Sequence, residues 1–184
     1  MSQKKPYFKL ADYLFIAMMA AMGIAVKVIV TPLAQLLTGP LFIPGGVAAG
    51  GFYMLFLVLA ISITRKKGTA LLVALVQAVL VMITGMLGSH GAASLLTYTL
   101  PGLAVEAVWL LLGRGRGKGG PVCCFVAGIC ANIAGSYSVN LLIFRLPAIP
   151  LLLSLAVAAL FGGLGGWVAY GLANQVRRLQ IWQI

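Results

Sequence analysis

The sequence predicts an all-helical integral membrane protein with six transmembrane helices and both termini in the cytoplasm. The chain is 62% hydrophobic, and only 8% of its 184 residues are charged, whereas soluble domains contain about 25% charged residues. So few polar residues cannot cover a globule in water. Intrinsically disordered chains have low hydrophobicity, so this composition excludes disorder. Three cysteines are too few for a disulfide scaffold.

Six apolar runs are each long enough to cross a bilayer core of about 30 Å as a helix of about 20 residues. Because a bilayer core offers no water to bare peptide groups, each run must be a helix or part of a closed barrel. Continuous apolar composition, without alternation at every second residue, favours helices. We expect a single membrane domain over residues 1–184, with spans at about 12–36, 41–64, 69–88, 92–113, 121–144 and 147–174.

The lysines and arginines set the orientation of these spans. Most of the 13 cationic residues lie before the first span or after the second, fourth and sixth, and the positive-inside rule places that side in the cytoplasm. We therefore expect a multi-pass membrane protein with both termini in the cytoplasm. The cationic side chains, which give the chain a net charge of +11, are expected to contact anionic lipid headgroups rather than nucleic acid. The cations on this side are Lys4, Lys5, Lys9, Arg65, Lys66, Lys67, Arg114, Arg116, Lys118, Arg177 and Arg178.

The sequence predicts neither an enzyme nor a metal or cofactor site. His90 is the one histidine and Asp12 and Glu106 are the only acids, so no nucleophile, base and orienting group can be assembled. His90 has no cysteine or carboxylate near it in sequence with which to hold a metal. The chain also has no GxxxxGK[ST] motif for ATP. Any ATP-driven work would therefore be powered by another chain.

A polar stripe runs along the fifth span, where Asn132, Ser136 and Asn140 recur every four residues on one helix face. Unpaired amides in lipid are costly, so the stripe either bonds a neighbouring helix or lines a cavity. Other polar residues at a similar outer depth favour a cavity, and Gln77 in the middle of the third span is placed to form its floor. These residues are Thr84, Ser89, His90, Thr97, Tyr98, Thr99 and Tyr137.

Two ionisable residues lie well inside the spans, where such residues are costly and are candidates for function. Glu106 is expected roughly 10 Å from the cytoplasmic end and Lys27 roughly 22 Å from it, so they are not expected to pair. Lys27 either has a functional role or extends toward the outer headgroups. Glu106 has no such route and is expected to bond neighbouring polar groups. Asp12 is expected to cap the first helix.

Small residues predict close helix contacts in two places. Ala17, Ala21 and Ala25 form one face of the first span, which suits packing either inside the bundle or against a helix of another protein. The glycines at 162, 163, 165 and 166 favour packing within this chain. The apolar outer connection 38–46, rich in glycine and proline, is expected to be either a lid over an outward opening or an ordinary turn.

Together these features resemble the substrate-binding S component of energy-coupling factor (ECF) vitamin transporters. They are six helices in fewer than 200 residues, the alanine face, the apolar first outer loop and the glycine-rich last helix. Three segments are similar to the subfamily associated with thiamin and its hydroxymethylpyrimidine precursor: Arg65–Leu71 (RKKGTAL), Gly85–Gly91 (GMLGSHG) and Gly102–Val108 (GLAVEAV). Gln77 stands where an acidic residue is expected in that subfamily.

The resemblance implies a high-affinity binding subunit of an ATP-driven importer for a water-soluble vitamin or precursor, located as a multi-pass protein in the cell (inner) membrane of a bacterium or archaeon. Its ligand would sit in an outward-facing cavity under the first outer loop. The face of Ala17, Ala21 and Ala25 would contact a transmembrane T component, and two cytoplasmic ATPases would drive the cycle. Cobalt and nickel members are disfavoured, because their metal site uses an N-terminal histidine and this chain starts Met-Ser-Gln. The candidate ligand contacts are Glu106, Gln77, Asn132, Asn140, Ser136, His90, Tyr98, Tyr137 and Trp109.

Two other functions remain open. The chain could be a stand-alone secondary transporter or channel in which Glu106 relays protons or ions. It could also be a structural subunit without a ligand, in which case neighbouring helices would satisfy the whole polar stripe of the fifth span.

Overall fold

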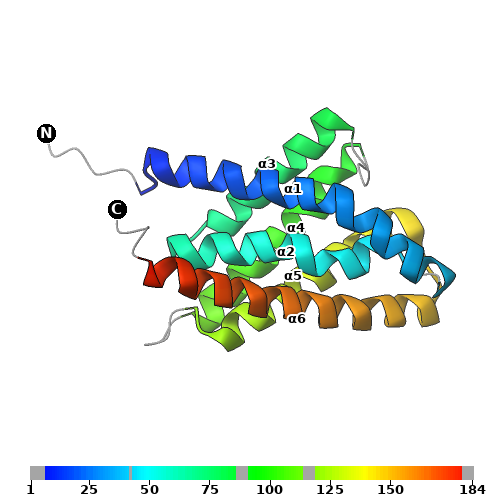
Figure 1. Cartoon of the computed structure of the whole chain (residues 1–184). Coiled ribbons are helices and arrows are strands. Elements are labelled where there is room, and N and C mark those ends of the chain that lie inside the picture. The colour runs from blue at the N-terminus through cyan, green and yellow to red at the C-terminus, as the bar shows by residue number, and fades with distance from the viewer. Residues whose placement is uncertain (1–6, 42, 86–90, 114–118, 180–184) are drawn as a thin grey trace, which may run out of the picture.

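The computed structural model describes residues 7–41, 43–85, 91–113 and 119–179. Six α-helices of the described chain pack into one bundle (Figure 1). A short 3₁₀ turn, η1 (Gly39–Leu41), follows the first helix, and a π-helical turn, η2 (Asn140–Phe144), continues the fifth. The six helices are α1 (Leu10–Thr38), α2 (Gly45–Thr64), α3 (Thr69–Thr84), α4 (Ala93–Leu112), α5 (Pro121–Val139) and α6 (Ala148–Arg178).

The predicted all-helical membrane fold is confirmed, and α3 is its short member. Within the described residues, five helices are long and apolar enough to cross a membrane, whereas α3 has 16 residues and a length of about 24 Å. The expected span 69–88 is therefore too long at its end. Gly85 ends the helix because it adopts a φ of 59°, which residues with a side chain rarely adopt. Residues 86–88 lie outside the described part of the chain.

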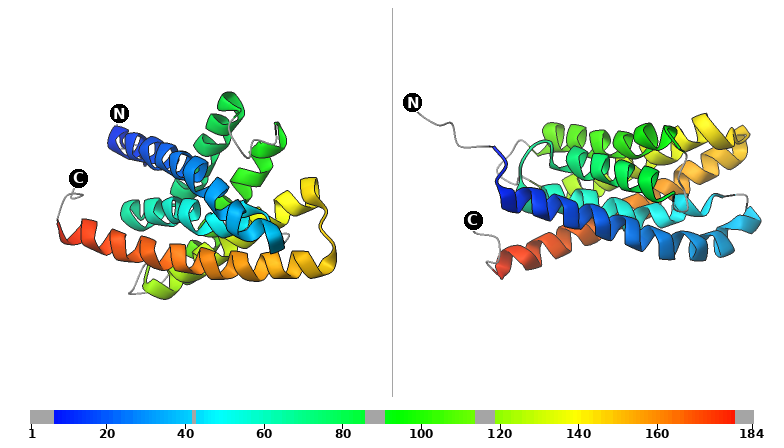
Figure 2. Two further views of the ribbon diagram at one scale, coloured as in Figure 1. Left: turned by 45° about the vertical axis from the view of Figure 1, so that its right-hand side comes forward. Right: turned by 90° about the horizontal axis from the view of Figure 1, so that it is seen from above.

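The helices alternate in direction, so α1 begins and α6 ends at the same end of the bundle (Figures 1 and 2). The turn between α2 and α3 lies at that end too, with Arg65, Lys66 and Lys67. Lys66 forms an ion pair there with Asp12, and Asp12 accepts a hydrogen bond of 2.7 Å from the backbone of Lys9. This arrangement agrees with an even number of crossings and with a cytoplasmic cluster of cations.

Helix α2 lies in the centre of the bundle and packs against α1, α3, α5 and α6. Glycines allow the helix backbones to approach closely. A Cβ at Gly165 would lie 2.0 Å from the carbonyl oxygen of Gly51 in α2, and one at Gly162 would lie 2.4 Å from that of Gly128 in α5. The glycines of α6 therefore pack within the chain, as expected, and hold α2, α5 and α6 together.

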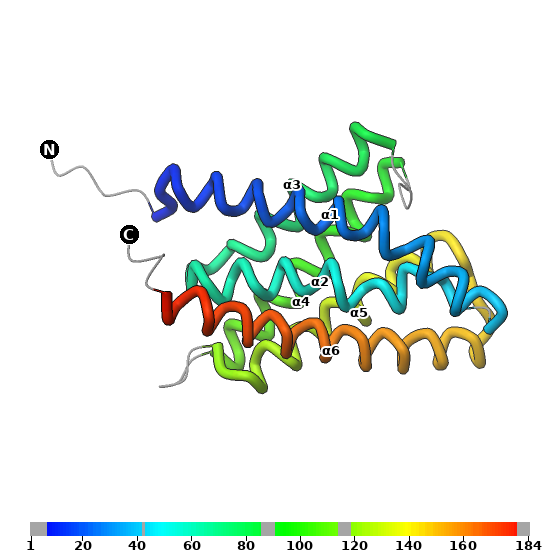
Figure 3. Tube along the Cα trace, in the orientation of Figure 1, coloured from blue at the N-terminus to red at the C-terminus, as the bar shows by residue number. Residues whose placement is uncertain are grey.

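The outer end of α1 lies against the start of α2. The path of α1 changes direction in its second half (Figure 3), which contains Pro32, and a proline inside a helix removes a hydrogen bond and kinks it. Gln35 then accepts a hydrogen bond from the backbone nitrogen of Gly45. Thr38 donates to the carbonyl oxygen of Ile43 at 2.9 Å, which fixes the connection that follows η1.

Candidate functional site

A cavity of about 200 Å³ opens among the helices in the half of the bundle away from the termini. The outer parts of α1, α2, α4, α5 and α6 form its walls, and α3 contributes Gln77. The first outer connection supplies Pro44, and the first residues of α2 supply Gly45 and Gly46. This segment therefore forms part of the cavity wall, as expected for a connection that covers an outward opening.

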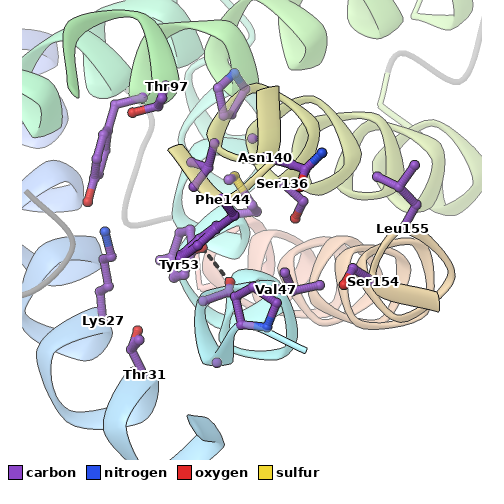
Figure 4. A pocket seen from close by; sticks show the side chains of 18 of the residues that line it. Lys27, Thr31, Val47, Tyr53, Thr97, Ser136, Asn140, Phe144, Ser154 and Leu155 are labelled. Atoms are coloured by element: carbon purple, nitrogen blue, oxygen red, sulfur yellow. Dashed lines mark hydrogen bonds between the residues drawn. The ribbon is translucent and has the colours of Figure 1, made fainter. Parts of the chain in front are cut away.

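Four of the candidate ligand contacts line this cavity. Ser136 reaches it from α5, Asn140 from the start of η2, Tyr98 from α4 and Gln77 from α3 (Figure 4 labels the first two). Thr97 also lines it. The outer half of the polar stripe of α5 thus faces open space rather than a neighbouring helix.

Lys27 also lines the cavity. The residue is 8% exposed, so its side chain is buried within the bundle, which favours a functional role over extension toward the outer headgroups. The Nζ atom lies 4.3 Å from the ring centroid of Tyr98 and 5.6 Å from that of Tyr53, within the range of cation–π interactions. In Figure 4, Lys27 and Thr31 project from α1 toward the cavity.

Three polar atoms around the cavity are buried without a hydrogen-bond partner among the described residues. They are the Oγ1 of Thr31, the Nε2 of Gln77 and the Oγ of Ser154. Space for Gln77 comes from Gly23, since a Cβ at Gly23 would lie 2.2 Å from that Nε2. Buried polar groups are normally hydrogen-bonded, so these three atoms indicate a place for a polar ligand or for water.

Two other polar residues of the cavity wall already bond the protein. The Tyr53 hydroxyl donates to the carbonyl oxygen of Gly46 at 2.6 Å, drawn as a dashed line in Figure 4. Asn140 accepts a hydrogen bond of 2.8 Å from the backbone nitrogen of Leu146 through its Oδ1. This bond orients the Asn140 amide and leaves its NH₂ group as a donor for a ligand.

Glu106 does not line the cavity. Its Oε1 accepts a hydrogen bond of 2.9 Å from the backbone nitrogen of Ala70, in the first turn of α3. The first amide groups of a helix lack partners inside it, and a carboxylate there is favoured by the helix dipole. Gly102, one turn before Glu106, lets α4 approach α3, since its Cβ would lie 2.5 Å from the Cβ of Ala74. Glu106 is therefore a cap for α3.

Asn132 is also placed away from the cavity. Its Nδ2 donates to the carbonyl oxygens of Val47 in α2 and Ala158 in α6, at 3.0 and 2.9 Å. Gly50 makes room for the amide, because a Cβ there would lie 1.8 Å from the Asn132 Oδ1. The inner residue of the stripe thus bonds neighbouring helices, while Ser136 and Asn140 line the cavity.

The other aromatic candidates lie elsewhere. Tyr137 is 49% exposed on the outside of the bundle, where the membrane lies. Trp109 is buried near the cytoplasmic end, where its ring would meet a Cβ at Gly119 at 2.3 Å. His90 lies outside the described residues. None of these three is among the described residues of the cavity wall.

Thr31, Tyr53 and Ser154 also line the cavity, although they were not among the candidate ligand contacts. Thr31 lies one helical turn after Lys27, so the pair could have been found from their shared face on α1. Tyr53 and Ser154 gave no such signal, because each is a single polar residue in an apolar run. Together the wall presents an ammonium group, amide and hydroxyl groups and aromatic rings, a set suited to binding a small polar molecule.

Comparisons with known proteins concern the family and the fold of the chain. A family described as "ABC-type cobalt transport system, permease component" matches residues 11–134. A solved structure titled "Crystal structure of an S-component of ECF transporter" has a similar fold, with a TM-score of 0.74 and 19% sequence identity over 95% of this chain and 88% of that chain. No match was found among curated proteins.

Proposed function

The chain belongs to the family of permease components of ABC-type cobalt transport systems, and we propose that it is the substrate-binding S component of an energy-coupling factor importer. The observation that carries this proposal is the outward-half cavity with its unpartnered polar atoms on Thr31, Gln77 and Ser154. The fold similarity to a solved S component supports it. The family and the fold are those of a multi-pass transport protein of the cell membrane rather than an enzyme.

We propose an organic cargo in place of the cobalt that the family description names. No group of three His, Cys, Asp or Glu side chains able to hold a metal ion occurs in the described chain. Cobalt is bound best by imidazole, thiolate and carboxylate groups, and the cavity wall presents amides and hydroxyls beside Lys27. A divalent cation would also be repelled by that ammonium group.

The resemblance to the thiamin and hydroxymethylpyrimidine subfamily makes these two compounds the first ligands to test. Tyr98 offers an aromatic face, and the amides of Gln77 and Asn140 are suited to ring nitrogens. Ser136 would add a hydroxyl group. Of the two compounds the uncharged pyrimidine suits this wall better, because Lys27 carries the same charge as the thiazolium ring of thiamin.

We propose that the alanine face of α1 contacts a transmembrane T component. Two cytoplasmic ATPases would bind that T component and power the transport cycle. Ala17, Ala21 and Ala25 are all exposed on the outside of the bundle, so they do not pack within this chain. Small residues on an exposed face let another helix approach closely.

Two measurements test this function, one on the purified protein and one in cells. Native mass spectrometry of protein expressed in rich medium is expected to detect one small organic molecule bound per chain. In cells that also express T and ATPase subunits, Ala21→Leu is expected to abolish uptake while binding stays within threefold of the wild type. Ala107→Leu, at an exposed position of α4, is the control and should transport normally. Loss of binding in Ala21→Leu, or transport in liposomes without ATPases, would contradict the proposal.

A further inference from the structure

Lys27 is a buried cation for which the chain supplies no carboxylate partner. Only two side chains of the protein are acidic. Asp12 is paired with Lys66 at the cytoplasmic end, and Glu106 caps α3 through the backbone of Ala70. An ammonium group removed from water is costly unless it is paired. The rings of Tyr53 and Tyr98 offset that cost only in part.

Three polar residues of the cavity wall, Thr31, Gln77 and Asn140, can donate hydrogen bonds to a ligand. Thr31 lies one turn further along the same face of α1, and its Oγ1 is buried without a partner in the described chain. The Nε2 of Gln77 is also unpartnered, and it can only donate. Asn140 has its oxygen occupied by the Leu146 backbone, which leaves its NH₂ group. Such a set of donors is complementary to a ligand rich in acceptor oxygens.

We propose that the cargo is a small organic anion whose carboxylate, or another acidic group, binds Lys27 and Thr31. This inference rests on the proposed function and differs from the cargo that the resemblance implies, since thiamin is a cation and hydroxymethylpyrimidine is neutral. The anion supplies the missing charge of Lys27, and a charge-assisted hydrogen bond is the strongest that an ammonium group makes.

The cavity also limits the size and shape of the anion. Its volume of about 200 Å³ is below the 300–1,000 Å³ common for sites of drug-sized ligands, so the cargo is a compact molecule. Tyr53 and Tyr98 flank Lys27, and Leu57, Val139 and Leu155 add apolar wall. An acidic group at one end of a ring or short apolar body fits this arrangement.

Acids compared with their own amides test the proposal, and thiamin and hydroxymethylpyrimidine represent the cargo that the resemblance implies. Binding to the purified protein would be measured by calorimetry for nicotinate and nicotinamide, for biotin and biotinamide, and for thiamin and hydroxymethylpyrimidine. Any molecule that co-purifies would be identified by mass spectrometry. The expected result is an anionic co-purified molecule, or an acid from the panel that binds at least tenfold more tightly than its amide.

Variants of Lys27 connect this preference to the site. Lys27→Met keeps the length and packing of the side chain and is expected to weaken binding of the anion about 10- to 100-fold. Lys27→Arg keeps the charge and should retain part of the affinity. Lys67→Met removes the same charge from an exposed residue at the cytoplasmic end and should bind as the wild type does.

The possible results distinguish the anionic cargo from the S-component function on which it rests. Three results would overturn the anionic cargo and leave the S-component function intact. They are a neutral or cationic co-purified molecule, tightest binding by thiamin or hydroxymethylpyrimidine, and an anion whose affinity is unchanged in Lys27→Met. No bound molecule in the purified protein and no binding by any compound of the panel would overturn the binding function itself.

Discussion

Replacing Glu106 separates a structural role from a role in binding. Glu106→Ala removes the acceptor of the 2.9 Å hydrogen bond from the Ala70 backbone. An unsatisfied buried amide costs about 1–3 kcal/mol, and the lost charge at the helix N-terminus adds about 0.3–1 kcal/mol. Glu106→Gln keeps an acceptor oxygen and loses only the charge. We therefore expect a destabilisation of roughly 1–4 kcal/mol for alanine and below about 1 kcal/mol for glutamine.

Thermal unfolding in detergent measures this difference. Cys123 and Cys124 are buried, so a thiol-reactive dye reports unfolding. At about 2–4 °C per kcal/mol for a chain of this size, Glu106→Ala should lower Tm by roughly 2–16 °C and Glu106→Gln by no more than about 4 °C. Ligand affinity of Glu106→Gln should stay within threefold of the wild type, because Glu106 does not line the cavity.

Two results would refute this reasoning. If Glu106→Gln lost ligand binding while its Tm stayed unchanged, the carboxylate would have to contact the cargo. If the chain alone moved a substrate in liposomes along a proton gradient, and Glu106→Gln abolished that movement, the side chain would be a proton relay of a stand-alone transporter.

Two further substitutions test the geometry of the site. Gly23→Ala should weaken ligand binding about tenfold, because its Cβ would lie 2.2 Å from the Nε2 of Gln77 and displace that amide. The control is Gly171→Ala, which has nothing within 4 Å of its Cβ and should bind normally. Equal affinities of the two variants, measured by calorimetry, would show that Gln77 does not contact the cargo. Asn132→Ala removes hydrogen bonds to α2 and α6. It should lower the free energy of unfolding by roughly 1–3 kcal/mol and change ligand affinity by less than threefold. An unchanged Tm together with lost binding would place Asn132 in the site.

The fold was predictable from the sequence because each helix follows from a local feature. The apolar runs set the helices, and the prolines and glycines between them set most boundaries within a few residues. The exception is α3, where the run from Gly85 to Leu87 continues the apolar composition. Gly85 nevertheless adopts a left-handed conformation that ends the helix, and hydropathy does not distinguish a glycine within a helix from one that caps it.

The site was predictable only in part, since sequence spacing defines the face and depth of a residue but not its neighbour. Asn132 and Asn140 share a face of α5, yet Asn132 bonds the backbones of α2 and α6 and Asn140 lines the cavity. Glu106 was expected near the cytoplasmic end of its span, but only the structure shows that it is level with the start of α3. The surroundings of Lys27 could not be predicted, because Tyr53 and Tyr98 reach its ammonium group from two other helices.

The most direct test of the central claim is the bound mass of a variant with a blocked cavity. Ser154 is buried and lines the cavity, so Ser154→Phe should fill it, whereas Ala156→Phe places the same ring on an exposed position of α6. Native mass spectrometry is predicted to find one small molecule on the wild type and on Ala156→Phe, and none on Ser154→Phe. An unchanged bound molecule on a folded Ser154→Phe protein would contradict the account, because the cargo would then lie outside this cavity.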